Sequence, residues 1–242
     1  MKKIVTLLLT ALLCVSCVVF CGNRVAEASE EEIIQAHKPS IHWRVDTTGK
    51  YLNDDSVNCV ICVEAVSPNL ARVLMYEKSQ INGKTVWTNT LACEGVIGLN
   101  GLGKTKEGDN MTPIGDFGFS AAFGIKENPG AAITYVDITE DIYCCSDEVA
   151  YNQLIDIREF PHDCADGEHM IEYSPEYNYG LFIDYNKEGT PGLGSAIFLH
   201  CKGANTYTGG CIAVDEDCMI QILKAADANA RIIIDYAPDY AE

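Results

Sequence analysis

Residues 194–214 read GSAIFLHCKGANTYTGGCIAV, and this stretch indicates the kind of fold that the chain adopts. An apolar run ends at His200, a loop rich in Gly, Asn, Thr and Tyr follows, and a Gly-Gly turn leads into a second apolar run that begins at Cys211. Short runs of β-branched and aromatic residues between turn residues are typical of strands. The stretch therefore predicts two strands joined by a loop.

The same pattern continues over most of the chain from Val57 onward. The predicted strands are residues 59–66, 71–77, 84–92, 114–121, 132–136, 169–173, 180–185, 196–201, 211–214 and 231–236. One helix is predicted after Asp215, because this residue type is a good N-cap and apolar residues recur at helical spacing from Met219 to Ala226. Many short strands with one or two short helices predict a mainly β fold, as a β-sandwich or a closed sheet.

The first residues resemble a secretory signal peptide. Two lysines precede an apolar run over residues 4–20, and a small-residue Val-Ala-Glu-Ala site follows at 25–28. The apolar run is short for a membrane span. We therefore expect residues 1–28 to be removed on export, and the mature protein to be extracytoplasmic. Two alternatives stay open: an uncleaved membrane anchor, and lipid attachment at Cys17.

The rest of the chain divides into two parts. Residues 29–56 carry charges and turn residues with little periodicity, which is typical of a leader or linker, and residues 57–237 are expected to form one domain. Cleavage would remove three basic residues and one acidic residue, so that 17 basic and 35 acidic side chains become 14 and 34, with a net charge of −20. Because nucleic acid binds to basic surfaces, the composition excludes it as a partner.

Export would also place the cysteines where disulfides persist. Of the 12 cysteines, three precede residue 29 and nine follow it. Nine is odd, so pairing leaves at least one free thiol. We expect Cys211 to be free and most of the other eight to be bridged. Cys201 should point to the opposite face of its strand from His200, because neighbouring side chains alternate.

The remaining cysteine motifs favour structural roles over metal binding. Cys59 and Cys62 are three residues apart in a predicted strand and should point to opposite faces, which argues against a shared site. The Cys144-Cys145 pair is expected to staple a loop with Cys164, since no histidine lies at ligand spacing near the pair. We expect His162 and His169 to be solvated or hydrogen-bonded. No metal site is predicted.

Cys211 and His200 are the candidate nucleophile and base. A thiol beside an imidazole can become a thiolate at neutral pH, so we expect the sulfur within about 4 Å of a ring nitrogen. The other ring nitrogen should donate to a backbone carbonyl or a small polar side chain. Gly209 and Gly210 would let the backbone approach a substrate, with the amides of Gly210 and Cys211 directed at an oxyanion. Alternatively, His200 only ends a strand and Cys211 is half of a disulfide.

The two motifs of the chain resemble those of the YkuD family of L,D-transpeptidases. That family has a His and a Gly, a loop, and then Ser/Thr-x-Gly-Cys with an aliphatic residue. The corresponding residues here are His200, Gly203, Thr208, Gly210, Cys211 and Ile212. Residues 103–117, GKTKEGDNMTPIGDF, are similar to the family's Lys…Glu-Gly-Asp…Thr-Pro-x-Gly-x-Phe block. The resemblance covers about residues 57–236.

This chain departs from the family at two positions. Gly209 stands where many members have His, and Ala213 stands where many have Arg. The small residue at 213 also occurs in the branch of the family that this chain resembles most. If the missing Arg holds a substrate carboxylate, Lys104 or Lys202 could replace it.

The resemblance implies a cysteine-dependent L,D-transpeptidase that acts on peptidoglycan stem peptides and needs no metal or organic cofactor. Cys211 would form a thioester with the stem, and His200 would act first as base and then as acid. An amine acceptor gives a cross-link, whereas water makes the enzyme an L,D-carboxypeptidase. Further substrate-binding candidates are Gly203, Thr208, Lys104 and Asn152. The alternative from another class is a non-catalytic, disulfide-stapled secreted domain that binds cell wall.

Overall fold

The computed structural model describes residues 45–238 and residue 240. The expected signal peptide, residues 1–28, and Cys17 within it lie outside the described residues. No helix among the described residues is long and apolar enough to cross a membrane.

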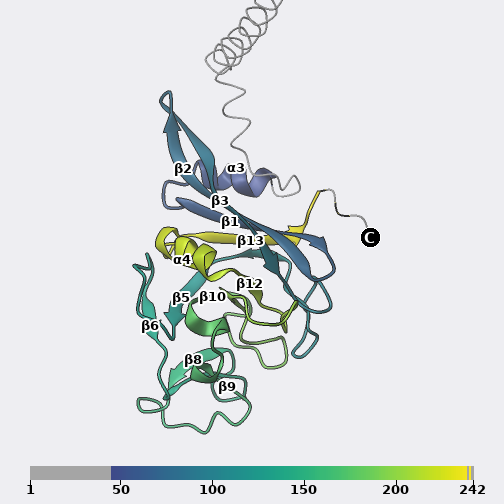
Figure 1. Ribbon diagram of the computed structural model, residues 1–242, viewed down its shortest axis with the longest axis vertical. Helices are drawn as coiled ribbons and strands as arrows, with labels where there is room; N and C mark the ends of the chain where they lie inside the picture. Colours follow the sequence, from purple (N-terminus) through teal and green to yellow (C-terminus); the bar gives the residue numbers. More distant parts are fainter. Residues whose placement is uncertain (1–44, 239, 241–242) are drawn as a thin grey trace, which may run out of the picture.

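The molecule is mainly β, as the sequence predicts, and is built on one large mixed sheet (Figure 1). Its ten strands are β1 (Cys59–Ser67), β2 (Leu70–Ile81), β3 (Lys84–Val96), β4 (Gly115–Phe117), β5 (Phe119–Gly124), β6 (Tyr135–Asp137), β10 (Gly180–Ile183), β11 (Phe198–Cys201), β12 (Ile212–Val214) and β13 (Arg231–Tyr236). They lie in the order β4-β13-β1-β2-β3-β12-β11-β10-β5-β6.

The large sheet curls back toward itself. Only Gly118 separates β4, at one edge of the sheet, from β5, which lies next to the other edge. The main apolar core lies on one face of this sheet, and Ile61 of β1, Leu199 of β11 and Ile222 of the helix that follows β12 contribute to it. Burial of this apolar surface is the main stabilising contribution to such a fold.

A smaller sheet and two α-helices complete the fold. The small sheet has the order β8-β7-β9, with β7 (Ile142–Cys145), β8 (Gln153–Asp156) and β9 (Glu168–His169). Figure 1 shows it at the opposite end of the molecule from helix α3 (Val45–Leu52). Helix α4 (Glu216–Ala225) follows β12, and two short 3-10 helices, η2 (Met170–Glu172) and η3 (Glu176–Asn178), follow β9.

Helix α4 begins directly after Asp215, as predicted. Its apolar side chains Met219, Ile222 and Leu223 are buried, which confirms the helical spacing. The side chain of Asp215 makes no capping hydrogen bond. The first-turn carboxylate of Glu216 instead accepts hydrogen bonds from neighbouring segments of the chain and suits the positive end of the helix dipole.

Strand β11 positions the site because its side chains alternate between two cores. Leu199 and Cys201 belong to the main core, whereas Phe198 belongs to a second core on the other face and the His200 ring packs against Tyr177 of that core. Cys201 and His200 therefore point to opposite faces, as expected from the alternation.

The structure differs from the prediction in four segments. Residues 45–52, expected in the leader, form helix α3, because Tyr51 is buried against β1 and β2 and its hydroxyl donates to the Asp116 carboxylate at 3.0 Å. Residues 114–121 are divided into two strands at Gly118. Residues 169–173 are mostly the 3-10 helix η2, and the segment that holds the short strands β7 and β8 was not predicted to form strands.

Candidate active site

His200 and Cys211 line one pocket of about 700 Å³. His200 lies on β11, and Cys211 directly precedes the parallel neighbouring strand β12. In the parallel pairing of β11 with β12, His200 lies beside Ala213. Cys211 is two residues before Ala213, so its side chain lies on the same face of the sheet as Ala213 and the imidazole. The pattern strand, loop, strand thus brings both predicted residues to one pocket.

The His200 imidazole is buried and is oriented by the backbone. Its Nδ1 lies 2.7 Å from the carbonyl oxygen of Cys201, which can only accept, so Nδ1 carries the proton. Burial lowers the pKa of His200 below its ordinary value of 6.5. The ring is therefore neutral near pH 7, and its Nε2 is left with a lone pair that can accept a proton. The predicted orienting hydrogen bond to a backbone carbonyl is confirmed.

The Cys211 thiol is buried and protonated in the resting structure. Its sulfur donates to the carbonyl oxygen of Ala196 at 3.1 Å and accepts from the amide of Phe198 at 3.3 Å. Burial and the charge of Glu168 raise the pKa of Cys211 to about 12. No hydrogen bond among the described residues joins this sulfur to His200. The expected thiolate and imidazole pair is thus not formed at rest.

The backbone of Cys211 is fixed by two threonines, one three residues before it and one from a distant segment of the chain. The hydroxyls of Thr208 and Thr112 both donate to the Cys211 carbonyl, at 2.6 and 3.2 Å. Thr112 is fully buried and its hydroxyl also accepts from the Gly98 amide. The two sequence motifs, around residues 112 and 211, therefore meet at the candidate nucleophile.

The two glycines before Cys211 have different roles. Gly209 lines the pocket, and a Cβ there would meet open space. The Gly210 amide was expected to point at an oxyanion. It donates instead to the Thr208 hydroxyl at 3.1 Å. Gly210 has a φ of +144°, and a Cβ there would lie 2.8 Å from the carbonyl oxygen of Met111. Glycine is required at 210 by the backbone rather than by a substrate.

Lys104 lines the pocket, but its charge is already balanced. Its ammonium is buried and lies 3.0 Å from a carboxylate oxygen of Asp109. Although burial opposes ionisation, hydrogen bonds from the amides of Thr105 and Lys106 and from Lys104 lower the pKa of Asp109 to about 2. The pair shapes the loop, and a substrate carboxylate would compete with Asp109. Lys202 pairs with Glu94 and Asp215 instead.

The remaining weak candidates are divided between the pocket and its support. Gly203 lines the pocket, and a Cβ there would overlap the Glu176 carboxylate. Asn152 is buried and is not among the residues that line the pocket. Its amide oxygen accepts from the Ala196 amide at 3.0 Å, so Asn152 holds the residue that binds the Cys211 sulfur. Ala196 needs this support because its φ is +52°.

The sequence did not predict the acidic wall of the pocket. The carboxylates that line it are Glu107, Asp166, Glu168, Glu172 and Glu176. Burial raises the pKa of Glu168, and the Tyr177 hydroxyl donates to this carboxylate at 2.5 Å. The many acidic residues around 163–176 are visible in the sequence, but nothing there indicates that they fold over Cys211.

The cysteines follow the prediction only in part. The one disulfide among the described residues joins Cys145 and Cys164, so the predicted loop staple is confirmed. The free cysteines are Cys59, Cys62, Cys93, Cys144, Cys201, Cys211 and Cys218. Cys211 is free as expected, but the expectation that most of the others are bridged is wrong. Cys59 and Cys62 belong to different cores on opposite faces of β1, which explains why this pair cannot bridge.

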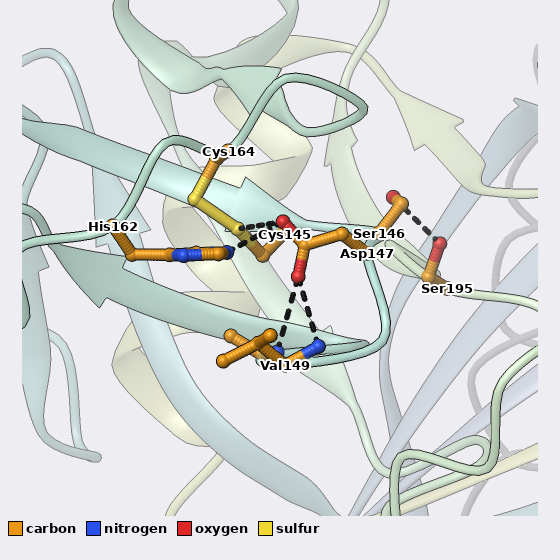
Figure 2. Close-up of a disulfide and its surroundings, with 8 residues drawn as sticks. Cys145, Ser146, Asp147, Val149, His162, Cys164 and Ser195 are labelled. Atoms are coloured by element: carbon orange, nitrogen blue, oxygen red, sulfur yellow. Dashed lines mark hydrogen bonds and ion pairs between the residues drawn. A yellow bond between two sulfur atoms is a disulfide. The ribbon is translucent and has the colours of Figure 1, made fainter.

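Two histidines outside the pocket are hydrogen-bonded, as expected. His169 contacts the carboxylate of Glu172 and the carbonyl of Glu140. His162 lies against the Asp147 carboxylate beside the disulfide, as Figure 2 shows. No histidine lies at ligand spacing near the Cys144-Cys145 pair in the sequence, but the loop after β8 returns His162 to the end of β7.

Two comparisons with known proteins found no match to this chain. No protein-family model matches the chain, and no curated protein matches it either. The resemblance to the YkuD family rests on the two sequence motifs whose residues meet at Cys211.

Proposed function

We propose that the protein is a cysteine-dependent acyl transferase that acts on peptidoglycan stem peptides, as an L,D-transpeptidase exported to the cell wall. One observation carries this proposal. A free thiol, Cys211, and a neutral imidazole, His200, whose Nδ1 is tied to the backbone, line the same pocket from neighbouring parallel strands. The motif resemblance supplies the substrate class.

The first half of the reaction makes a thioester. The thiol leaves the Ala196 carbonyl and turns to Nε2 of His200, which takes the proton as the sulfur attacks the carbonyl carbon of an L,D-peptide bond. The carbonyl electron pair moves to oxygen and returns as the C–N bond breaks. The leaving amine takes the proton from His200. A terminal D-amino acid is released, and the stem remains bound to sulfur.

The second half transfers the acyl group to an amine. The amine first loses one proton to solvent; neutral His200 takes a second proton from it as it attacks the thioester, the C–S bond breaks, and the leaving thiolate takes that proton from His200 to regenerate the thiol. Five carboxylates line the pocket against the paired Lys104, which favours the approach of a cationic amine over an anionic group. Water in place of the amine would give L,D-carboxypeptidase activity from the same site.

The neutral resting pair fits this use of a general base. A thiol with a pKa raised to about 12 is not a free thiolate near pH 7, so it reacts only when a base removes its proton during attack. The lowered pKa of His200 keeps the base form available at neutral pH. The alternative, a non-catalytic binding domain, would not need a free thiol in a pocket with a neutral imidazole.

The test is turnover of defined stems by the full chain. Tetrapeptide stems would be incubated with and without an amine acceptor, and D-alanine and cross-linked product would be measured by liquid chromatography and mass spectrometry. We expect D-alanine release in both cases and cross-links with acceptor. Release without cross-links would favour the carboxypeptidase. No release while Cys211 is reduced would leave the binding domain as the better reading.

A further inference from the structure

A second cluster of cysteine and histidine lies about the Cys145–Cys164 disulfide (Figure 2), and its four residues are not among those that line the Cys211 pocket. Cys145, Asp147, His162 and Cys164 each offer one ligand atom, and these four atoms all lie within 4.8 Å of one another. Cys145 ends β7, Asp147 lies in the turn after it, and the other two lie in the loop between β8 and β9.

The Asp147 carboxylate is already oriented for a ligand. One oxygen, Oδ1, accepts hydrogen bonds from the amides of Val149 and Ala150, at 3.0 and 3.2 Å. The other oxygen, Oδ2, lies 2.6 Å from Nε2 of His162 and 3.8 Å from the Cys145 sulfur. Outer-shell hydrogen bonds of this kind fix the direction of a metal-binding carboxylate.

The burial of the cluster leaves a route for an ion. The two sulfurs belong to a small apolar core with Ala150 and Ile155. The side chains of His162 and Asp147 are 19% and 20% exposed, so the nitrogen and oxygen side of the cluster faces solvent. An ion could enter there and be held from behind by the sulfurs.

We propose that these four side chains form a tetrahedral zinc site when the disulfide is reduced. Two thiolates, an imidazole and a carboxylate are ligands that zinc takes, with bonds of about 2.0 to 2.3 Å. Ligand atoms around such an ion lie about 3.3 to 3.8 Å apart, which follows from tetrahedral geometry and those bond lengths. The present spread of up to 4.8 Å therefore needs only a small adjustment, with the sulfurs moving apart.

The reaction that opens the site is a thiol–disulfide exchange with a dithiol reductant. The reductant gives two electrons and two protons, the S–S bond breaks to two thiols, and the reductant becomes a disulfide. Zinc then displaces the two thiol protons and binds an oxygen of Asp147, and the proton on His162 Nε2, the nitrogen that faces Asp147 at 2.6 Å, moves to Nδ1 so that Nε2 can bind the ion. The chain would thus carry a disulfide under oxidising conditions and zinc under reducing ones.

Both the disulfide and the proposed zinc ion would link β7 to the loop after β8 and so hold one wall of the Cys211 pocket in place. Ser146, between the ligands Cys145 and Asp147, lines the pocket, and its hydroxyl lies 3.0 Å from that of Ser195, which also lines it. Ser195 precedes Ala196, whose carbonyl holds the Cys211 thiol. The inference itself does not depend on the proposed transferase activity, because zinc binding is measured separately.

The test is metal binding by the full chain in both redox states. Oxidised and reduced protein, desalted under nitrogen, would be titrated with Co²⁺ and then Zn²⁺, with bound metal measured by elemental analysis and the Co²⁺ spectrum recorded. We expect one ion per reduced chain, with an absorption spectrum of tetrahedral thiolate coordination, and none per oxidised chain. His162→Ala and Asp147→Asn keep both cysteines, so their oxidised forms check that they fold.

The variants decide whether this cluster is the site. Loss of a ligand should weaken binding by at least about 10- to 100-fold, the range that loss of an outer-shell partner costs. The matched controls His169→Ala and Cys218→Ser lie outside the cluster and should bind as the wild type does. Absence of stoichiometric metal in the reduced wild type, or binding that is unchanged in His162→Ala and Asp147→Asn, would overturn the proposal.

Discussion

Within residues 45–238, a cysteine and a histidine share a site at Cys211 and again at Cys145, and their surroundings give them different chemistry. At Cys211 the thiol and the His200 ring are buried, the ring is tied to a backbone carbonyl, and both groups are neutral. At Cys145 the sulfur is in a disulfide, and the nearby His162 is tied to a carboxylate that is partly exposed.

The contrast shows how the partner of a histidine decides its role. A carbonyl partner fixes the tautomer without adding charge, so His200 can take a proton and pass it on. A carboxylate partner adds negative charge, which suits a cation. The same two residue types thus support acyl transfer in one region and, as we infer, metal binding in the other.

The largest expected effect is on stem turnover, after a substitution at Cys211. Cys211→Ala removes the sulfur that would form the proposed thioester and should lower stem turnover by about 10⁴-fold or more. Because Cys211 is not bridged, the free energy of unfolding should fall by only about 1 kcal/mol. Cys62→Ala, which changes another buried free cysteine in a core different from that of Cys211, is the matched control and should keep full turnover. Equal turnover in both variants would exclude Cys211 as nucleophile.

The next effect separates the base from the nucleophile. His200→Gln should slow turnover by about 10²- to 10⁴-fold, the range for general base catalysis. In the wild type, kcat/KM should fall as pH drops through the lowered pKa of His200, below 6.5, because the base form is lost. The variant should instead gain rate toward high pH, where the Cys211 thiol ionises. If kcat/KM of His200→Gln fell at low pH in the same way as that of the wild type, this assignment would be contradicted.

His200 also makes stability depend on pH. Its pKa is lower in the folded chain than in the unfolded one, so the unfolded state binds more protons between the two values. Stability is therefore full above about pH 6.5 and is lost as pH falls below it. His200→Gln should remove this part of the pH dependence, which thermal unfolding between pH 5 and 8 would measure.

The smallest expected effect concerns the second region. The Cys145–Cys164 disulfide closes a sequence separation of 19 residues, and a loop of this length contributes about 3 kcal/mol. Reduction without metal should therefore lower the melting temperature by about 6 to 12 °C for a domain of this size. Stem turnover should be reduced less than by either pocket variant. The double variant Cys145→Ala, Cys164→Ala is the control, since its melting temperature should not respond to reductant.

Local pattern predicted the elements that carry the site. The alternation in residues 196–201 placed His200 and Cys201 on opposite faces, and the helical spacing after Asp215 predicted α4. Strand β13 coincides with its predicted bounds, 231–236. These features depend on periods of two and 3.6 residues, which a single sequence shows directly.

Long-range packing accounts for what the sequence could not predict. The acidic segment around Glu168 folds over Cys211 across more than forty positions, and burial there makes the thiol neutral. Gly210 resembles an oxyanion donor in sequence, but its amide is used by Thr208. His162 reaches the disulfide only because the loop after β8 returns to β7. None of these contacts leaves a periodic signal.

Acylation of Cys211 tests the central claim most directly. The full chain would be incubated with a carbapenem, a class that acylates many members of the YkuD family, and its intact mass and peptide map recorded for wild type and Cys211→Ala. The account predicts one adduct per wild-type chain, mapped to Cys211, and none on the variant. An adduct that persists in Cys211→Ala, or a wild type that stays unmodified by carbapenem and by stems with Cys211 reduced, would contradict it.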